Sequence, residues 1–149
     1  MLFTWLRKPR AWLALGLVVL VGLLAWLPVR TQQVNAQVVE EIRANPQGER
    51  AARTMIIFLA DGRVYPVNYL REDDLVFMGI DGRWWRAFQS SSEPVEMVIQ
   101  GQRWSGHAQV VLDDPEYVVD VFARLRPKAP SWLPLWLNGK LVVITLQPD

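Results

Sequence analysis

The chain has 149 residues, a net charge of +1 at pH 7, one histidine and no cysteine. The missing cysteine excludes disulfides, thiolate metal sites and cysteine nucleophiles, and one histidine excludes histidine-rich metal sites. From Arg53 onward there are ten Lys and Arg against twelve Asp and Glu, whereas a nucleic-acid surface requires a basic patch. We therefore expect no metal and no nucleic-acid partner.

Residues 1–30 contain an uncharged apolar run, Ala11–Val29. About 20 apolar residues in a helix span the hydrocarbon core of a bilayer. Trp5 and Trp12 lie near one end of the run and Trp26 near the other, where indole rings prefer the interface. We expect a cytoplasmic stub followed by a single transmembrane helix that anchors the protein in the lipid bilayer.

The charges around this run predict its orientation. Arg7, Lys8 and Arg10 precede it, whereas Arg30 alone follows it closely, so the positive-inside rule places the N-terminus in the cytoplasm and the rest of the chain outside the cell membrane. A cleaved signal peptide is the alternative, because Val34-Asn35-Ala36 resembles a cleavage site. The apolar run is longer than the usual 7–15 residues of a signal peptide, which favours the retained anchor.

Residues 31–52 form a polar connector rich in Gln, Glu and Ala. Its apolar residues recur at helical spacing and predict a short amphipathic helix: Val34, Val38, Val39 and Ile42. Asn45-Pro46-Gln47-Gly48 ends this helix.

Residues 53–149 show short apolar runs separated by turn signals, such as Asp61-Gly62, Asp81-Gly82 and Gly101-Gln102. The pattern predicts six strands: Met55–Leu59, Val64–Leu70, Leu75–Ile80, Val95–Gln100, Arg103–Leu112 and Lys140–Leu146. Asp113-Asp114-Pro115-Glu116 is typical of a helix start, with an Asp cap and Pro in the first turn. Six strands with one helix before the last indicate a mainly β domain that closes into a barrel.

The order of motifs along this domain resembles the split β-barrel proteins of the flavin- and deazaflavin-dependent nitroreductase type, relatives of pyridoxamine phosphate oxidase. The match runs from about Arg53 to Pro148. The residues that carry it are Gly62, Arg63, Pro66, Val67, Tyr69, Trp84, Trp85, Arg86, Phe88, Gly101, Ala108, Val110, Val111, Asp113, Pro115 and Glu116.

The resemblance implies a six-stranded split β-barrel with one or two short helices, which binds FMN or a deazaflavin in a groove. It implies hydride transfer to a quinone, a nitro compound or a related acceptor. It also implies that basic residues near the first hairpin and the Trp segment hold the phosphate while aromatic residues border the ring. The expected cofactor-binding residues are Arg63, Tyr69, Arg83, Trp84, Trp85 and Arg86, and no catalytic residue is identified.

Two functions stay open at this point. One is a membrane-anchored oxidoreductase that uses FMN or a deazaflavin. The other is a non-catalytic accessory subunit of a larger membrane complex, with a barrel that binds no cofactor. Fold alone does not decide between them, and a homodimer fits either function.

The most distinctive loop is Trp132-Leu133-Pro134-Leu135-Trp136-Leu137. Connecting loops are usually polar because they face water. This loop therefore either covers the end of the barrel or contacts the bilayer interface or a partner subunit, settings in which tryptophan is common. The expected contact residues are Trp132, Leu133, Leu135 and Trp136.

Overall fold

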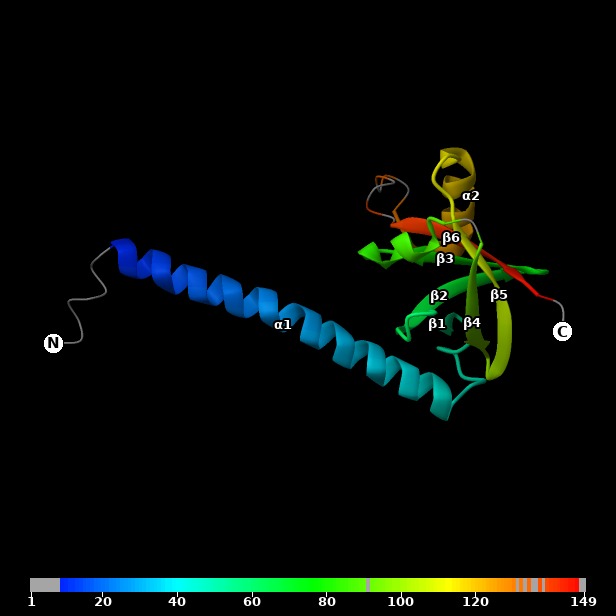
Figure 1. Ribbon diagram of the computed structural model, residues 1–149, viewed down its shortest axis with the longest axis horizontal. Helices are drawn as coiled ribbons and strands as arrows, with labels where there is room; N and C mark the ends of the chain where they lie inside the picture. Colours follow the sequence, from blue (N-terminus) through cyan, green and yellow to red (C-terminus); the bar gives the residue numbers. More distant parts are fainter. Residues whose placement is uncertain are drawn as a thin grey trace. The chain divides into compact units, whose positions relative to one another are not determined.

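The computed structural model describes residues 9–90, 92–130, 132, 134, 137 and 139–147 (Figure 1). The chain divides into two compact units, residues 1–37 and residues 38–149, and each is described by itself. The helices are α1 (Pro9–Ala44), the 3-10 helix η2 (Arg83–Phe88) and α2 (Pro115–Leu125).

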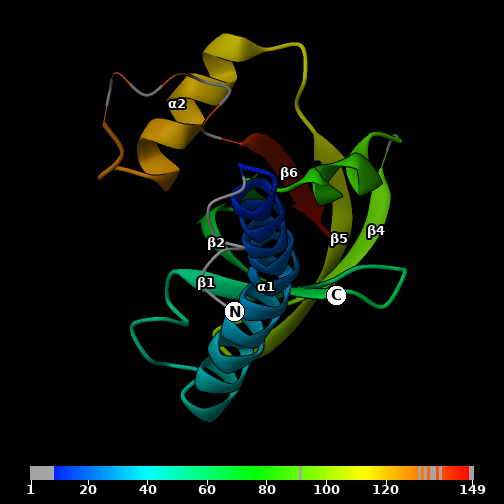
Figure 2. The same ribbon diagram turned by 90° about the vertical axis from the view of Figure 1, so that its left-hand side faces the viewer.

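The second unit contains six antiparallel strands that close into a barrel in the order β1-β2-β3-β6-β5-β4. The strands are β1 (Thr54–Phe58), β2 (Val64–Glu72), β3 (Leu75–Ile80), β4 (Glu93–Ile99), β5 (Gln102–Val110) and β6 (Lys140–Leu146). The prediction of a mainly β, six-stranded barrel is confirmed. Figure 2 shows α2 outside the barrel.

The barrel interior is built by alternation along the strands. In β4, Val95, Met97 and Ile99 are buried while Pro94 and Glu96 are exposed, because successive side chains of a strand point to opposite faces. The inward side chains of all six strands form one core, from which water is excluded.

α2 covers the outer face of the sheet at β3 and β6. Its residues Val121 and Phe122 are buried against Phe77 of β3 and Leu141 of β6. The two strands are therefore apolar on both faces, which explains their continuous apolar runs. The N-terminus of α2 is capped as predicted, since the Asp114 side chain accepts a hydrogen bond from the Tyr117 backbone N–H at 3.0 Å.

The prediction of a transmembrane helix within residues 1–30 is wrong. The sequence predicted an anchor and a separate short connector helix, whereas α1 is a single helix of 36 residues. The apolar first half of this helix is followed, without a break, by a polar second half that carries Glu40, Glu41 and Arg43. Among the residues that the structure describes, none belongs to a helix both long and apolar enough to cross a bilayer.

The last turns of α1, which belong to the second unit, pack on the barrel. Val39 and Ile42 are buried with Ala51 and with Ile56 of β1. The helix ends before Asn45, whose carbonyl accepts a hydrogen bond from the Gly48 N–H at 3.0 Å. The Asn45–Gly48 breaker therefore lies where the sequence placed it.

Three hairpin turns use positive φ angles, and in the β2–β3 turn the residue is Asp73, with φ +52°. Gly62 has φ +85° at the β1–β2 turn, as expected for an Asp-Gly hairpin. At the β4–β5 turn, Gln100 and Gly101 have φ +48° and +81°, the pattern of a type I′ turn. The predicted turn Gly101-Gln102 was therefore one residue too late.

The cap of α2 gives a stability prediction. Replacing Asp114 with Ala leaves the Tyr117 N–H without its acceptor, so we expect the free energy of unfolding to fall by about 1 kcal/mol. Denaturant unfolding of the purified chain measures this change. Asp113→Ala is the matched control, and an equal loss in both variants would contradict the cap.

Candidate functional site

η2 lies at the end of the barrel where β3 finishes and β6 begins. The chain leaves β3 at Ile80 and turns at Asp81, whose carboxylate accepts bonds of 3.0 and 3.2 Å from Arg126 Nη2 of α2. η2 follows, and its last residue, Phe88, is buried in the barrel core. The short helix is thus held at both ends.

Gly139 brings the start of β6 against the end of β3. It has φ +77°, and a Cβ atom there would lie 2.4 Å from the Ile80 carbonyl oxygen. Only glycine fits this conformation and this approach. Lys140 consequently pairs with Ile80, and its Nζ lies 5.8 Å from the centre of the Trp85 ring.

Two cations flank Trp85. Arg86 lies with its guanidinium carbon 5.8 Å from the Trp85 ring centre, the same distance as Lys140 Nζ. Arg83 precedes Arg86 by three residues, and residues at that spacing eclipse one another in a 3-10 helix. Within the described ranges, Arg83, Arg86 and Lys140 form no ion pair: no carboxylate oxygen lies within 4.0 Å of their side-chain nitrogens.

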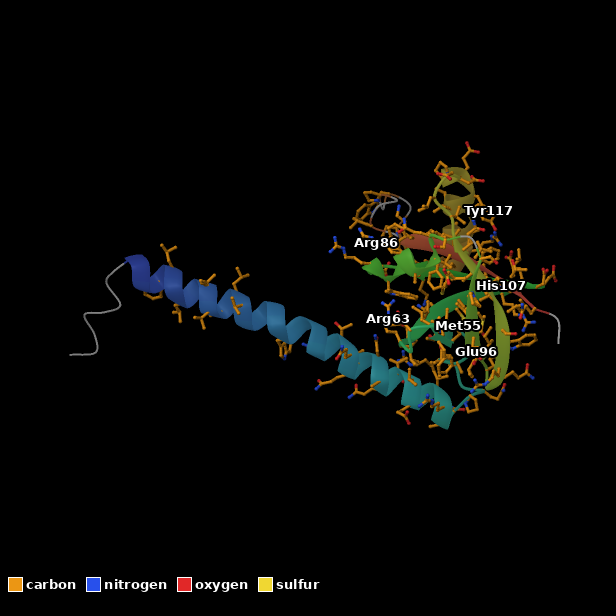
Figure 3. All side chains as sticks on the ribbon, in the orientation of Figure 1. Met55, Arg63, Arg86, Glu96, His107 and Tyr117 are labelled. Carbon is orange, nitrogen blue, oxygen red and sulfur yellow. The ribbon has the colours of Figure 1, made fainter. Side chains whose placement is uncertain are left out.

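A second group of aromatic rings adjoins this one. Tyr65 of β2 stacks on Trp84 with ring centres 4.5 Å apart and planes 16° apart. Trp84 in turn meets Phe88 edge to face at 5.9 Å. Arg63 Nη1 lies 3.4 Å from the Tyr65 hydroxyl. We call Arg63, Tyr65, Arg83, Trp84, Trp85, Arg86 and Lys140 the basic–aromatic cluster; Figure 3 labels Arg63 and Arg86 on the same side of the barrel.

Arg63 differs from the other cations because it has a partner within its own hairpin. Its Nε and Nη2 lie 2.7 and 2.6 Å from Asp61 Oδ2, and its backbone N–H donates to Asp61 Oδ1 at 3.0 Å. The hydrogen bonds from Arg63 lower the pKa of Asp61, and the bond to Asp61 raises the pKa of Arg63. Its charge is therefore largely compensated.

Tyr69 is not brought into this cluster. It lies four residues beyond Tyr65 on β2, about 13 Å at the rise of an extended strand, and pairs with Met78 of β3. Its side chain packs on the barrel core, and burial raises the pKa of its hydroxyl. The other five expected cofactor-binding residues lie on η2 or at the adjacent hairpin.

Sequence reasoning missed two members of the cluster, Tyr65 and Lys140. Tyr65 had a local signal, because it follows Arg63 by two residues and so faces the same side of β2. Lys140 had none, since its position depends on the pairing of β6 with β3. Only the tertiary structure shows that Lys140 belongs to the cluster.

The structure describes few positions of the apolar loop 132–137, whose contact with a bilayer or a partner was predicted. Trp132 is 76% exposed, whereas Leu133, Leu135 and Trp136 lie outside the described residues. The contact of this loop with a bilayer or a partner stays a prediction. Elsewhere, the described part of the chain contains no group of three His, Asp or Glu side chains placed to hold a metal ion.

Comparison with known proteins identifies relatives by fold only. No protein-family model matches the chain, and no curated protein matches it. Among solved structures, it is similar to an F420 reductase, with 8% identity, 65% of this chain and 88% of that chain covered, and a TM-score of 0.43.

Two further structures share the similarity. One is general stress protein 26 from Bacillus anthracis str. Sterne, with 18% identity, coverage of 72% and 87%, and a TM-score of 0.39. The other is an FMN-binding protein from Syntrophomonas wolfei subsp. wolfei, with 10% identity, coverage of 84% and 92%, and a TM-score of 0.36. Identity is low in all three.

The Asp61–Arg63 pair gives a pH prediction. Because the pKa of Asp61 in the folded protein is depressed below its ordinary value of 3.8, the stability that the pair contributes is present above pH 3.8. That contribution is lost as the pH falls through the depressed value. NMR titration of the Asp61 carboxyl should show the depressed pKa, and Arg63→Gln should raise it toward the ordinary value, while the backbone N–H of residue 63 still donates to Asp61. An unchanged titration in Arg63→Gln would show that the pair does not form in solution.

Proposed function

We propose that the barrel binds a flavin or deazaflavin through its phosphate and supports oxidoreductase chemistry with it. The observation that carries the proposal is the pair of cations beside Trp85, Arg86 and Lys140, with Arg83 three residues before Arg86 in η2. Arg83, Arg86 and Lys140 have no carboxylate partner in the residues that the structure describes. Uncompensated cations gathered at one place favour an anionic ligand.

The donor set suits a phosphate. Two guanidinium groups can each present a fork of N–H donors to phosphate oxygens, and the ammonium of Lys140 adds a point charge. The Trp85 ring restricts where these groups can lie, because both Arg86 and Lys140 contact its face. The chain thus supplies binding and orientation for the phosphate end.

The aromatic half of the cluster suits a flat ring system. Trp84 and Trp85 are half-buried beside the phosphate-binding candidates, and stacked aromatic rings are favourable partners for planar ligands. When bound, the flavin or deazaflavin would supply the hydride transfer. The residues of this chain would hold its phosphate, orient its ring and keep water from one side of it.

Two finer parts of the proposal rest on the sequence. One is a quinone as the acceptor, and the other is a location at the cell membrane. The orientation with the β domain outside, which the charges of Arg7, Lys8 and Arg10 predict, requires a membrane-spanning helix, and the described residues contain none. Both parts remain predictions, as does a homodimer or a contact with other membrane-complex subunits.

A second function is favoured by one specific contact. Asp61 compensates Arg63, one of the expected phosphate-binding residues. A barrel that has lost a cation from its cofactor site fits a non-catalytic accessory subunit of a larger membrane complex. The choice between the two functions depends on whether a phosphate-bearing cofactor binds.

Paired ligands with and without phosphate test the proposal. We expect the purified chain to bind FMN more tightly than riboflavin, which lacks the phosphate. Arg86→Ala together with Lys140→Ala should weaken FMN binding about 100-fold or more, because each charge-assisted bond contributes about 1.5–3 kcal/mol. Riboflavin affinity should stay unchanged. Fluorescence titration measures all four affinities, and F420 against its dephosphorylated core covers the deazaflavin case.

Arg103→Ala is the control, because Arg103 is paired with Glu96 at 2.8 Å on a different part of the barrel. It should leave FMN affinity unchanged. Arg63→Ala should have a smaller effect than Arg86→Ala, since Asp61 already compensates Arg63. If neither phosphate-bearing cofactor binds, the accessory function replaces the proposal.

A further inference from the structure

A groove of about 430 Å³ opens on the outer face of the barrel where β1 separates from β4. β1 pairs with β4 at only three positions, the last being Phe58 with Glu96. Pro94 follows toward the start of β4, and proline cannot donate to the ladder. The groove is lined by Phe58, Leu59, Ala60, Pro94, Val95, Glu96, Ser105, Gly106, His107 and Gln147.

The charge of this groove is nearly balanced. Glu96 is the carboxylate of its lining, and it forms an ion pair with Arg103 at 2.8 Å. The Arg103 guanidinium also lies 5.8 Å from the centre of the Phe58 ring. The groove therefore attracts neither anions nor cations strongly, in contrast to the basic–aromatic cluster.

Gln147 connects the polar groups of the groove. Its backbone N–H donates to the Ser105 carbonyl at 3.0 Å, which fixes the residue over β5. The Ser105 hydroxyl lies 3.4 Å from Gln147 Oε1, and Gln147 Nε2 lies 3.3 Å from His107 Nδ1. An amide N–H₂ can only donate, so Nδ1 of a neutral His107 accepts.

The orientation of the Gln147 amide in this network matches one tautomer of His107. With Nδ1 accepting, the proton of the neutral ring sits on Nε2. Among the described residues, no group accepts a hydrogen bond from Nε2, so its N–H is available as a donor. The walls beside it are apolar, since Phe58, Leu59 and Pro94 line the same space.

We propose that this groove is a second binding site, for an uncharged and partly apolar molecule that carries a carbonyl oxygen. His107 Nε2–H donates to that oxygen, and the apolar walls contact the rest of the molecule. The volume lies in the range of small-molecule sites, about 300–1,000 Å³. The lining of the groove contains no residue of the basic–aromatic cluster. The two sites adjoin different sides of β1, because Phe58 pairs with Val64 of β2 on one side and with Glu96 of β4 on the other.

Three aromatic probes of similar shape test the proposal on the full chain. They are 2-acetylnaphthalene, 2-ethylnaphthalene, which lacks the carbonyl, and the anionic 2-naphthoate. NMR titration should show 2-acetylnaphthalene shifting the amide signals of Phe58, Ser105 and Gln147. The ethyl compound should bind about 3- to 10-fold more weakly, the range expected for one lost hydrogen bond. The naphthoate should bind more weakly still, because Arg103 is already paired with Glu96 and the lining holds no free cation to offset the desolvation of its charge.

A variant isolates the donor. His107→Phe should reduce the affinity for 2-acetylnaphthalene to that for 2-ethylnaphthalene and leave the latter unchanged. Arg86→Ala, in the basic–aromatic cluster, is the control and should alter neither affinity. Equal affinities for the two neutral probes in the wild-type chain, shifts confined to other residues, or no binding of either probe would overturn the proposal.

The tautomer is measured without any variant. A long-range ¹H–¹⁵N spectrum of the wild-type imidazole should show Nε2 protonated and Nδ1 unprotonated in the neutral ring. Gln147→Leu removes the donor to Nδ1 and should shift the ring toward a mixture of tautomers. A proton on Nδ1 in the wild-type chain would overturn the assignment, because His107 would then present an acceptor to the groove.

Discussion

The pairing of β6 with two strands at once is the constraint on which the rest of the molecule depends. β6 runs between β3 and β5 and forms antiparallel ladders with both, which closes the barrel. Its first residue, Lys140, enters the basic–aromatic cluster, and Gln147, just beyond its last residue, connects the polar groups of the outer groove. Both candidate sites therefore take a residue from the ends of the same strand.

Compensation of charge separates the two sites. Several arginines of the barrel unit are held by carboxylates: Arg63 by Asp61, Arg103 by Glu96, Arg124 by Glu72 and Asp120, and Arg126 by Asp81. Arg83 and Arg86 lack such partners in the described ranges. The barrel therefore keeps an uncompensated positive charge beside η2, while its outer groove is close to neutral. An anionic ligand would bind preferentially beside η2, and an uncharged ligand would bind preferentially in the outer groove.

The features predicted correctly from the sequence are those that depend on neighbouring residues. The Asp61-Gly62 hairpin and the Asp114 cap are local, and short apolar runs between turn signals identify the strands. The single helix α1 was missed because an apolar run and a polar amphipathic run look like two segments, whereas the helix continues through both, Pro28 included. The 3-10 helix η2 has no distinctive periodicity over six residues, so its effect on Arg83 and Arg86 was not predictable.

The candidate site was predictable only in part for the same reason. Its η2 residues are contiguous in the chain, and the family resemblance pointed to them. Lys140 enters through a pairing between residues 60 positions apart (Ile80 and Lys140), and no local pattern records that pairing. Tyr69 was expected at the site because it ends the Asp-Gly-Arg-x-x-Pro-Val-x-Tyr motif that carries the family resemblance. The extended backbone of β2 carries it toward the other end of the barrel.

The place of β6 in the order of synthesis has a consequence for folding in the cell. The five earlier strands leave the ribosome before it, and until it arrives β3 and β5 each present an unpaired edge. Those edges are apolar on at least one face, so the nascent domain exposes a template for pairing with other chains. The time between translation of β5 and β6, which includes α2 and the loop that follows it, is therefore the period in which this domain depends most on chaperones.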